Sequence, residues 1–139
     1  MSEPINTFEY LSRFVVDRNY FRANHTVKHH AFMPNREGKT SVCRISGITD
    51  NQIWEIGAQV ARMRVKPLFG RADIRVFNVL SKSLLVVPTD PPPIRHADIV
   101  GWPEDKPKRI SIAQELAAET YLTPVPESQP NPSETSSQV

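Results

Sequence analysis

The chain of 139 residues has a single cysteine, Cys43, and contains no long apolar run. One cysteine can form no disulfide within the chain and cannot build a cysteine-based zinc site. No segment approaches the roughly 18 apolar residues of a membrane-spanning helix, so we expect a soluble protein without a membrane partner. The N-terminal residues also lack the positive charge and apolar core of a secretory signal. Together these absences predict a reducing, cytoplasmic location.

Sequence motifs for the common catalytic and nucleotide-binding sites are also missing. The five glycines are scattered, and none belongs to a phosphate-binding loop or a dinucleotide-binding fingerprint. No serine stands in the strained turn of a hydrolase nucleophile, and Cys43 lies among apolar residues, where a thiol is usually inert. There is no H-E-x-x-H pattern, and His25 and His29 are too far apart to share a zinc ion in an extended segment. We therefore expect no metal and no cofactor.

Net charge is small, at +2, and does not by itself indicate nucleic-acid binding. Arginine nevertheless supplies 11 of the 17 basic residues, and its planar group suits bidentate phosphate or carboxylate contacts. The segment from Thr123 onward holds two acids and no base, so the rest of the chain carries about +4. The composition thus indicates a weak basic bias.

Apolar spacing and turn residues predict three helices and several short strands. The helices are expected over residues 6–16, over residues 51–63 behind a Thr49 or Asp50 cap, and from a cap at Asp105 to about Thr120. Residues 26–34 and 40–45 alternate like two strands of a hairpin, which would turn His29 and His30 to opposite faces. Further strands are expected at residues 84–87, at residues 94–100 and at residues 72–80, where a short helix is the alternative.

These elements predict an α+β fold in one domain, residues 1–122. The expected architecture is a short mixed or antiparallel sheet packed by two or three helices. Residues 84–116 would close this domain by a core strand, a stiff crossing at the triple proline 91–93 and a final helix. Residues 123–139 are rich in proline and polar residues, and they predict a disordered tail.

Two histidines with nearby arginines form the first candidate site. We expect His30 and His96 to provide an acid and a base near neutral pH, with Arg44 or Arg95 holding a phosphate. Histidines 66 positions apart need not meet in the fold. The alternative is that His96 holds the proline loop by a hydrogen bond to a backbone carbonyl.

A run of basic residues between positions 62 and 75 forms the second candidate. Arg62, Arg64, Arg71 and Arg75, with Lys66, surround a single acid, Asp73. Such a ridge can follow the phosphates of a nucleic acid. The alternative is a solvated face whose arginine stems cover apolar surface.

The sequence thus leaves two functions open. One is a phosphate-directed domain that binds nucleic acid or a nucleotide through the ridge and the His/Arg cleft, with or without metal-independent phosphoester chemistry. The other is a non-enzymatic interaction module or accessory subunit that binds a protein partner through an apolar surface around Trp54 or Trp102.

Overall fold

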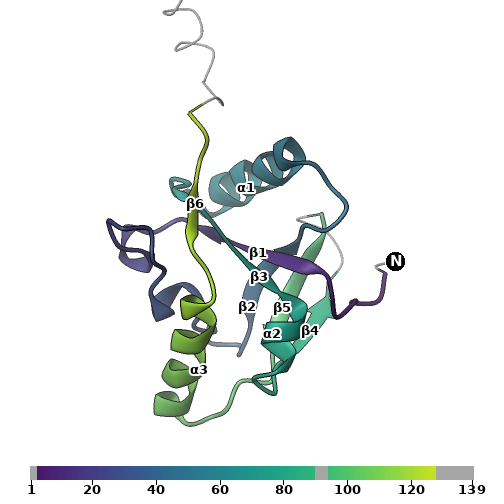
Figure 1. Ribbon diagram of the computed structural model, residues 1–139, viewed down its shortest axis with the longest axis vertical. Helices are drawn as coiled ribbons and strands as arrows, with labels where there is room; N and C mark the ends of the chain where they lie inside the picture. The colour runs from purple at the N-terminus through teal and green to yellow at the C-terminus, as the bar shows by residue number, and fades with distance from the viewer. Residues whose placement is uncertain (1–2, 90–93, 128–139) are drawn as a thin grey trace, which may run out of the picture.

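The computed structural model describes residues 3–89 and 94–127, and these fold into one antiparallel sheet with helices on both faces (Figure 1). The predicted α+β class is confirmed. Among the described residues there are six strands and three α-helices. The strands are β1 Tyr10–Val15, β2 Thr40–Arg44, β3 Gly70–Arg75, β4 Leu85–Pro88, β5 His96–Val100 and β6 Leu122–Pro124. The α-helices are α1 Asp50–Arg64, α2 Val76–Leu80 and α3 Lys106–Ala118, and the 3-10 helices are η1 Arg18–Tyr20 and η2 His29–Ala31.

The strands lie in the order β4-β5-β2-β1-β3-β6, and each is antiparallel to its neighbours. Helices α3, α2 and η2 cover one face, where Leu116, Val79 and Phe32 join the larger apolar cluster. Helix α1 covers the other face, where Ile53 and Ile56 pack with Phe14 and other residues of a smaller cluster. The central strands are therefore buried on both sides.

Two of the predicted helices are confirmed, and both begin at the expected caps. Thr49 Oγ1 accepts a hydrogen bond from the Gln52 amide, and the Gln52 side chain accepts one from the Thr49 amide, forming a capping box at α1. Asp105 caps α3 by accepting from the Lys108 amide, with a proline in the first turn. At these two helices, the capping residues and the apolar spacing were sufficient to predict the helix and its cap.

The helix predicted over residues 6–16 is wrong, because this segment contains the central strand β1. Five of its six residues are buried, since helices pack on both faces of the sheet here. A strand buried on both faces has no alternation of apolar and polar residues. The helical spacing of Phe8, Leu11 and Val15 is accidental, and Phe8 is 77% exposed.

The hairpin predicted from residues 26–34 and 40–45 is also wrong. The first segment forms isolated bridges at Thr26 and Val27 and then the 3-10 helix η2, whereas the second forms β2 between β1 and β5. The rings of His29 and His30 do not point to opposite faces, because in η2 their centroids lie 4.0 Å apart.

Two smaller differences concern segment ends. The strand predicted over residues 72–80 ends at Arg75, where α2 begins. The chain is still paired with β3 at Thr123 and Pro124, two residues beyond the expected end of the domain.

The triple proline 91–93 and most of the predicted tail, residues 128–139, lie outside the described residues. In the part of the chain that is described, no helix is both long and apolar enough to cross a membrane.

Candidate functional site

The two central strands separate partway along their length. Strand β1 pairs with β2 only at Leu11–Arg44 and Ser12–Cys43, although it continues beside β3 to Val15. Strand β2 in turn continues beside β5 to Thr40. We call the place where β1 and β2 part the fork. Figure 1 shows β1 and β3 running in a clearly different direction from β2 and β5.

A cavity of about 510 Å³ lies at this fork, and we call it the fork pocket. Its basic and imidazole side chains come from five separate parts of the fold: Arg13, His30, Lys39, Arg64 and His96. Its other lining residues are Phe14, Tyr20, Met33, Pro34, Asn35, Ser41, Val42, Cys43, Val60 and Met63. No carboxylate is among these lining residues. The pocket therefore combines a positive lining with an apolar wall.

Arg13 is the most unusual residue of the pocket, because it is a buried cation, only 9% exposed. Its Nε donates to the Ala31 carbonyl at 2.7 Å and its Nη1 to the Ser41 carbonyl at 2.9 Å. No ion pair found among the described residues includes it. Burial lowers its pKa to about 10, and the nearby Arg64 acts in the same direction. Arg13 thus stays charged at neutral pH without a carboxylate partner.

His96 is held in one orientation on the β5 side of the pocket. Thr89 Oγ1 contacts His96 Nδ1 and donates to the His96 backbone carbonyl at 3.1 Å. With the hydroxyl hydrogen on this carbonyl, Nδ1 donates to Oγ1 and Nε2 is the unprotonated nitrogen. Asp98 Oδ1 is 3.7 Å from Nε2, which is beyond hydrogen-bonding distance.

The pKa of His96 lies below its ordinary value of 6.5. Burial is the main cause, the cations Arg13 and Lys39 act in the same direction, and Asp98 opposes them. The imidazole is therefore neutral at physiological pH. Its response to Arg13 and Lys39 also indicates that both cations are close enough to act on it.

His30 lines the pocket from the opposite side, at η2, and is exposed. Its ring stacks on His29, which does not line the pocket. Burial lowers the pKa of His29, and the neighbouring His30 and Arg22 act in the same direction. His30 and His96 therefore line the same pocket, and their catalytic role stays a prediction.

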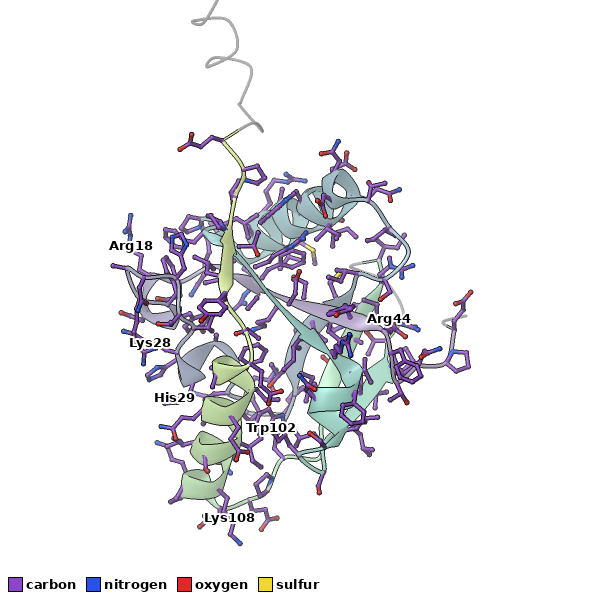
Figure 2. All side chains as sticks on the ribbon, in the orientation of Figure 1. Arg18, Lys28, His29, Arg44, Trp102 and Lys108 are labelled. Atoms are coloured by element: carbon purple, nitrogen blue, oxygen red, sulfur yellow. The ribbon has the colours of Figure 1, made fainter. Side chains whose placement is uncertain are left out.

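Arg44 and Arg95 are not part of this pocket. Arg44 forms a buried ion pair with Glu9, with Nε and Oε1 2.6 Å apart, and also donates to the Glu3 and Pro4 carbonyls. Arg95 donates to the Arg44 and Ser46 carbonyls. Figure 2 shows Arg44 near the start of β1, on the side opposite Arg18, Lys28 and His29. Arg44 thus anchors the N-terminal segment, and Arg95 holds the end of β2.

The predicted basic ridge does not form one surface. Arg71 is buried, lies 5.0 Å from the centre of the Trp54 ring, and pairs with Asp50 and Asp73. Arg75 lies near Tyr10 and donates to its hydroxyl. Arg62 and Arg64 are exposed in the last turn of α1. Of the four arginines, only Arg64 lines the fork pocket.

Neither tryptophan named in the protein-interaction hypothesis is an exposed side chain. Trp54 is buried beneath Arg71. Trp102 is half-buried against the larger apolar cluster, and its indole donates to the Ile99 carbonyl at 3.2 Å. In Figure 2 it lies beside α3.

Other reactive groups offer little to the site. Burial raises the pKa of the Cys43 thiol to about 11, so it is protonated at neutral pH. Across residues 3–89 and 94–127, no group of three or more His, Cys, Asp or Glu side chains is placed to hold a metal ion.

Sequence reasoning missed Arg13 and Lys39, which contribute two of the pocket's positive charges. The signal for Arg13 was present, since it is the one charged residue in the apolar run YLSRFVV, residues 10–16. A charged residue within a buried strand needs a polar or charged partner. Because residues 6–16 were interpreted as a helix, Arg13 was not recognised as a buried strand residue.

Comparison with known proteins adds no further assignment. No protein-family model, no curated protein and no solved structure gives a significant match to this chain.

Proposed function

We propose that the fork pocket binds an organic phosphate of mononucleotide size, either a free nucleotide or one unit of a nucleic acid. The observation that carries this proposal is Arg13, a charged guanidinium, nine-tenths buried, that lines the cavity without a carboxylate partner. A buried charge is costly unless it is paired, and a bound phosphate would pair it. Arginine is also well suited to phosphate geometry.

The remaining lining supports the same class of ligand. Lys39 and Arg64 add positive charge, although Lys39 also lies 3.8 Å from the exposed Glu37. Phe14, Met33 and Val60 supply an apolar wall against which a base can pack. The cavity volume of about 510 Å³ lies within the range of small-molecule sites, about 300–1,000 Å³.

We place this activity in the cytoplasm, because Cys43 is a free thiol and forms no disulfide within the chain. The proposal replaces the sequence-derived ridge and Arg44–Arg95 cleft by the lining of the fork pocket. It keeps His30 and His96 as the imidazoles of the site.

Calorimetric titration with the four ribonucleoside monophosphates, the matching nucleosides and inorganic phosphate tests this proposal. We expect at least one monophosphate to bind about tenfold or more tightly than its nucleoside, because charge-assisted hydrogen bonds to phosphate are lost in the latter. The affinity should fall as salt is added. Equal binding of nucleotide and nucleoside, or no binding of either, would contradict the proposal.

The last turn of α1 provides a matched pair of variants for this titration. Arg64 lines the pocket, whereas Arg62 is equally exposed in the same turn and does not. Arg64→Gln should weaken nucleotide binding by about tenfold, whereas Arg62→Gln should leave it unchanged. Equal effects would mean that general surface charge, and not the pocket, attracts the ligand.

A further inference from the structure

The two imidazoles of the fork pocket differ in the way that an acid–base pair requires. His96 is half-buried, fixed through Nδ1 by Thr89, and carries no hydrogen bond on Nε2 among the described contacts. His30 is exposed and stacks on a second imidazole. A neutral, oriented imidazole suits a general base, and an imidazole that is open to solvent can exchange protons with water and suits a general acid.

Arg13 connects the parts of the chain that carry these two rings. Its Nε binds the carbonyl of Ala31, the residue after His30, and its Nη1 binds the carbonyl of Ser41 on β2. Strand β2 pairs with β5, where Cys43 stands opposite His96. The buried guanidinium is therefore located between the two histidine-bearing segments. A phosphodiester that contacts this guanidinium would have its phosphorus beside it, between the same two segments.

The pocket lining lacks an activated nucleophile of its own. The Cys43 thiol is protonated at neutral pH, because burial raises its pKa to about 11. RNA supplies a nucleophile within the substrate, since its 2′-hydroxyl is next to the phosphorus that it attacks. RNA is thus the phosphoester that a base, an acid and a phosphate-binding cation are sufficient to cleave.

We propose that the fork pocket cleaves RNA by transesterification, with His96 as the general base and His30 as the general acid. His96 Nε2 takes the proton of the 2′-hydroxyl while the 2′-oxygen forms a bond to phosphorus. The bond from phosphorus to the 5′-oxygen breaks, and the His30 imidazolium gives its proton to that oxygen. Arg13 binds the non-bridging oxygens, where negative charge develops.

The products are a 2′,3′-cyclic phosphate and a free 5′-hydroxyl, and no further reactant is consumed. His96 ends protonated and His30 neutral, and exchange with water restores both. This reaction rests on the proposed phosphate binding, which does not itself require catalysis. Thr89 acts through His96 and is a positioning residue.

The test incubates the full chain with a mixed-sequence RNA oligonucleotide in the presence of EDTA and identifies the product ends by mass spectrometry. We expect 2′,3′-cyclic phosphate ends from RNA and no cleavage of the DNA oligonucleotide of the same sequence. Binding of that DNA is measured in parallel, because it contains the phosphates but lacks the 2′-hydroxyl.

Four variants assign the roles. His96→Gln and His30→Gln should each lower the cleavage rate by about a hundredfold or more, the usual contribution of general acid–base catalysis. Arg62→Gln and His25→Gln should keep the wild-type rate, since neither residue lines the pocket. If His96→Gln fails to fold in a thermal melt, the exposed His30→Gln decides the assignment.

The outcomes separate this reaction from the binding function. No cleavage of RNA by the wild-type protein, with DNA or a nucleotide still bound, would overturn the reaction and retain the binding. Equal cleavage by wild-type, His96→Gln and His30→Gln proteins would indicate a contaminating nuclease and also overturn it. Absence of binding to RNA, DNA and nucleotides would overturn both proposals.

Discussion

Among individual residues, the buried pair of Arg44 and Glu9 has the clearest consequence for stability. Their side chains are 10% and 7% exposed, and they form two hydrogen bonds. Burial alone would raise the pKa of Glu9, but hydrogen bonds from Arg44 and the Asn6 amide outweigh it and bring the pKa below its ordinary value. The carboxylate depends on Arg44 to remain charged.

Replacing Arg44 should therefore be costly. We expect Arg44→Met to lower the free energy of unfolding by about 3 kcal/mol, because it leaves a buried carboxylate unpaired. Urea denaturation measures the change. The control is Arg75→Met, which removes an exposed guanidinium near Tyr10 and should cost less than about 1 kcal/mol. Similar losses in the two variants would show that the buried pair contributes no more than a surface contact.

His96 predicts a loss of stability in mild acid. Its folded-state pKa is below 6.5, mainly through burial and also through Arg13 and Lys39, with Asp98 opposing. Below pH 6.5 the unfolded chain therefore binds a proton more readily, and the stability from neutral His96 is lost as the pH falls. The melting temperature should fall between about pH 7.5 and 5.5, and less so in His96→Gln. The same pH dependence in both proteins would exclude His96 as a source.

The ligand should move this same pKa. A phosphate beside Arg13 and Lys39 offsets the cations that disfavour protonation of His96. In NMR titrations we expect a higher His96 pKa with a bound nucleoside monophosphate than with the matching nucleoside, which lacks the phosphate. An unchanged His96 pKa in the presence of saturating nucleotide would place the phosphate elsewhere.

The candidate site was predictable only in part, for reasons that concern single residues. Histidines titrate near neutral pH, so His30 and His96 could be chosen by type alone. Arg44 and Arg95 could not be excluded, because nothing near them in sequence reveals the carboxylate and backbone carbonyls that they contact. Arg13 was missed because its role depends on the fork, which is a tertiary feature.

At the scale of elements, α1 links a local cap to the pocket. Its first turn is held by the Thr49 capping box, and its last turns carry Val60, Met63 and Arg64 of the lining. Thr49→Ala should lower the free energy of unfolding by about 1 kcal/mol, whereas Thr49→Ser should retain most of the stability. Thermal or urea denaturation measures both, and equal losses would show that the hydroxyl bond is not what stabilises the helix.

The pairing of β3 with β6 depends on a glycine. A Cβ at Gly70 would lie 2.4 Å from the Thr123 carbonyl oxygen and 2.9 Å from Leu122 Cδ1. Gly70→Ala should therefore displace β6, lower the free energy of unfolding by about 1–3 kcal/mol, and accelerate hydrogen exchange at Val125, whose amide donates to the Phe69 carbonyl.

Gly38→Ala is the comparison for this variant. Gly38 has a φ of +76° and no atoms near its Cβ position, so the substitution strains the backbone far from β6. It should leave exchange at Val125 slow. Slow exchange in Gly70→Ala as well would contradict the close β3–β6 contact.

Elements with local signals were predictable, and those set by burial were not. Helices α1 and α3 have caps and an apolar stripe, and both features depend only on residues that are close together in the sequence. Strand β1 is buried on both faces, so neither spacing rule describes it. Strand β6 is short and lies in a proline-rich segment, and the pairing that defines it comes from residues 70–72, more than 50 positions earlier.

For the whole molecule, the fork divides the sheet into two sets of strands, β4-β5-β2 and β1-β3-β6. The links between them include the two residue pairs of β1 with β2, the side-chain bonds of Arg13, and the hydrogen bonds of Tyr10 with Ile45 and Ser46 at the end of β2. Helix α1 packs over strands of both sets, through Phe14 and Cys43. The fork pocket is thus formed by both sets and belongs to neither alone.

A sheet joined so narrowly at its centre is mechanically softest there, because few backbone hydrogen bonds resist a change in the angle between its two parts. A ligand that contacts Arg13 on one strand set and His96 on the other would connect the two sets and resist a change in the angle between them. The stiffness of the sheet, and not only the occupancy of the pocket, then depends on whether the ligand is bound.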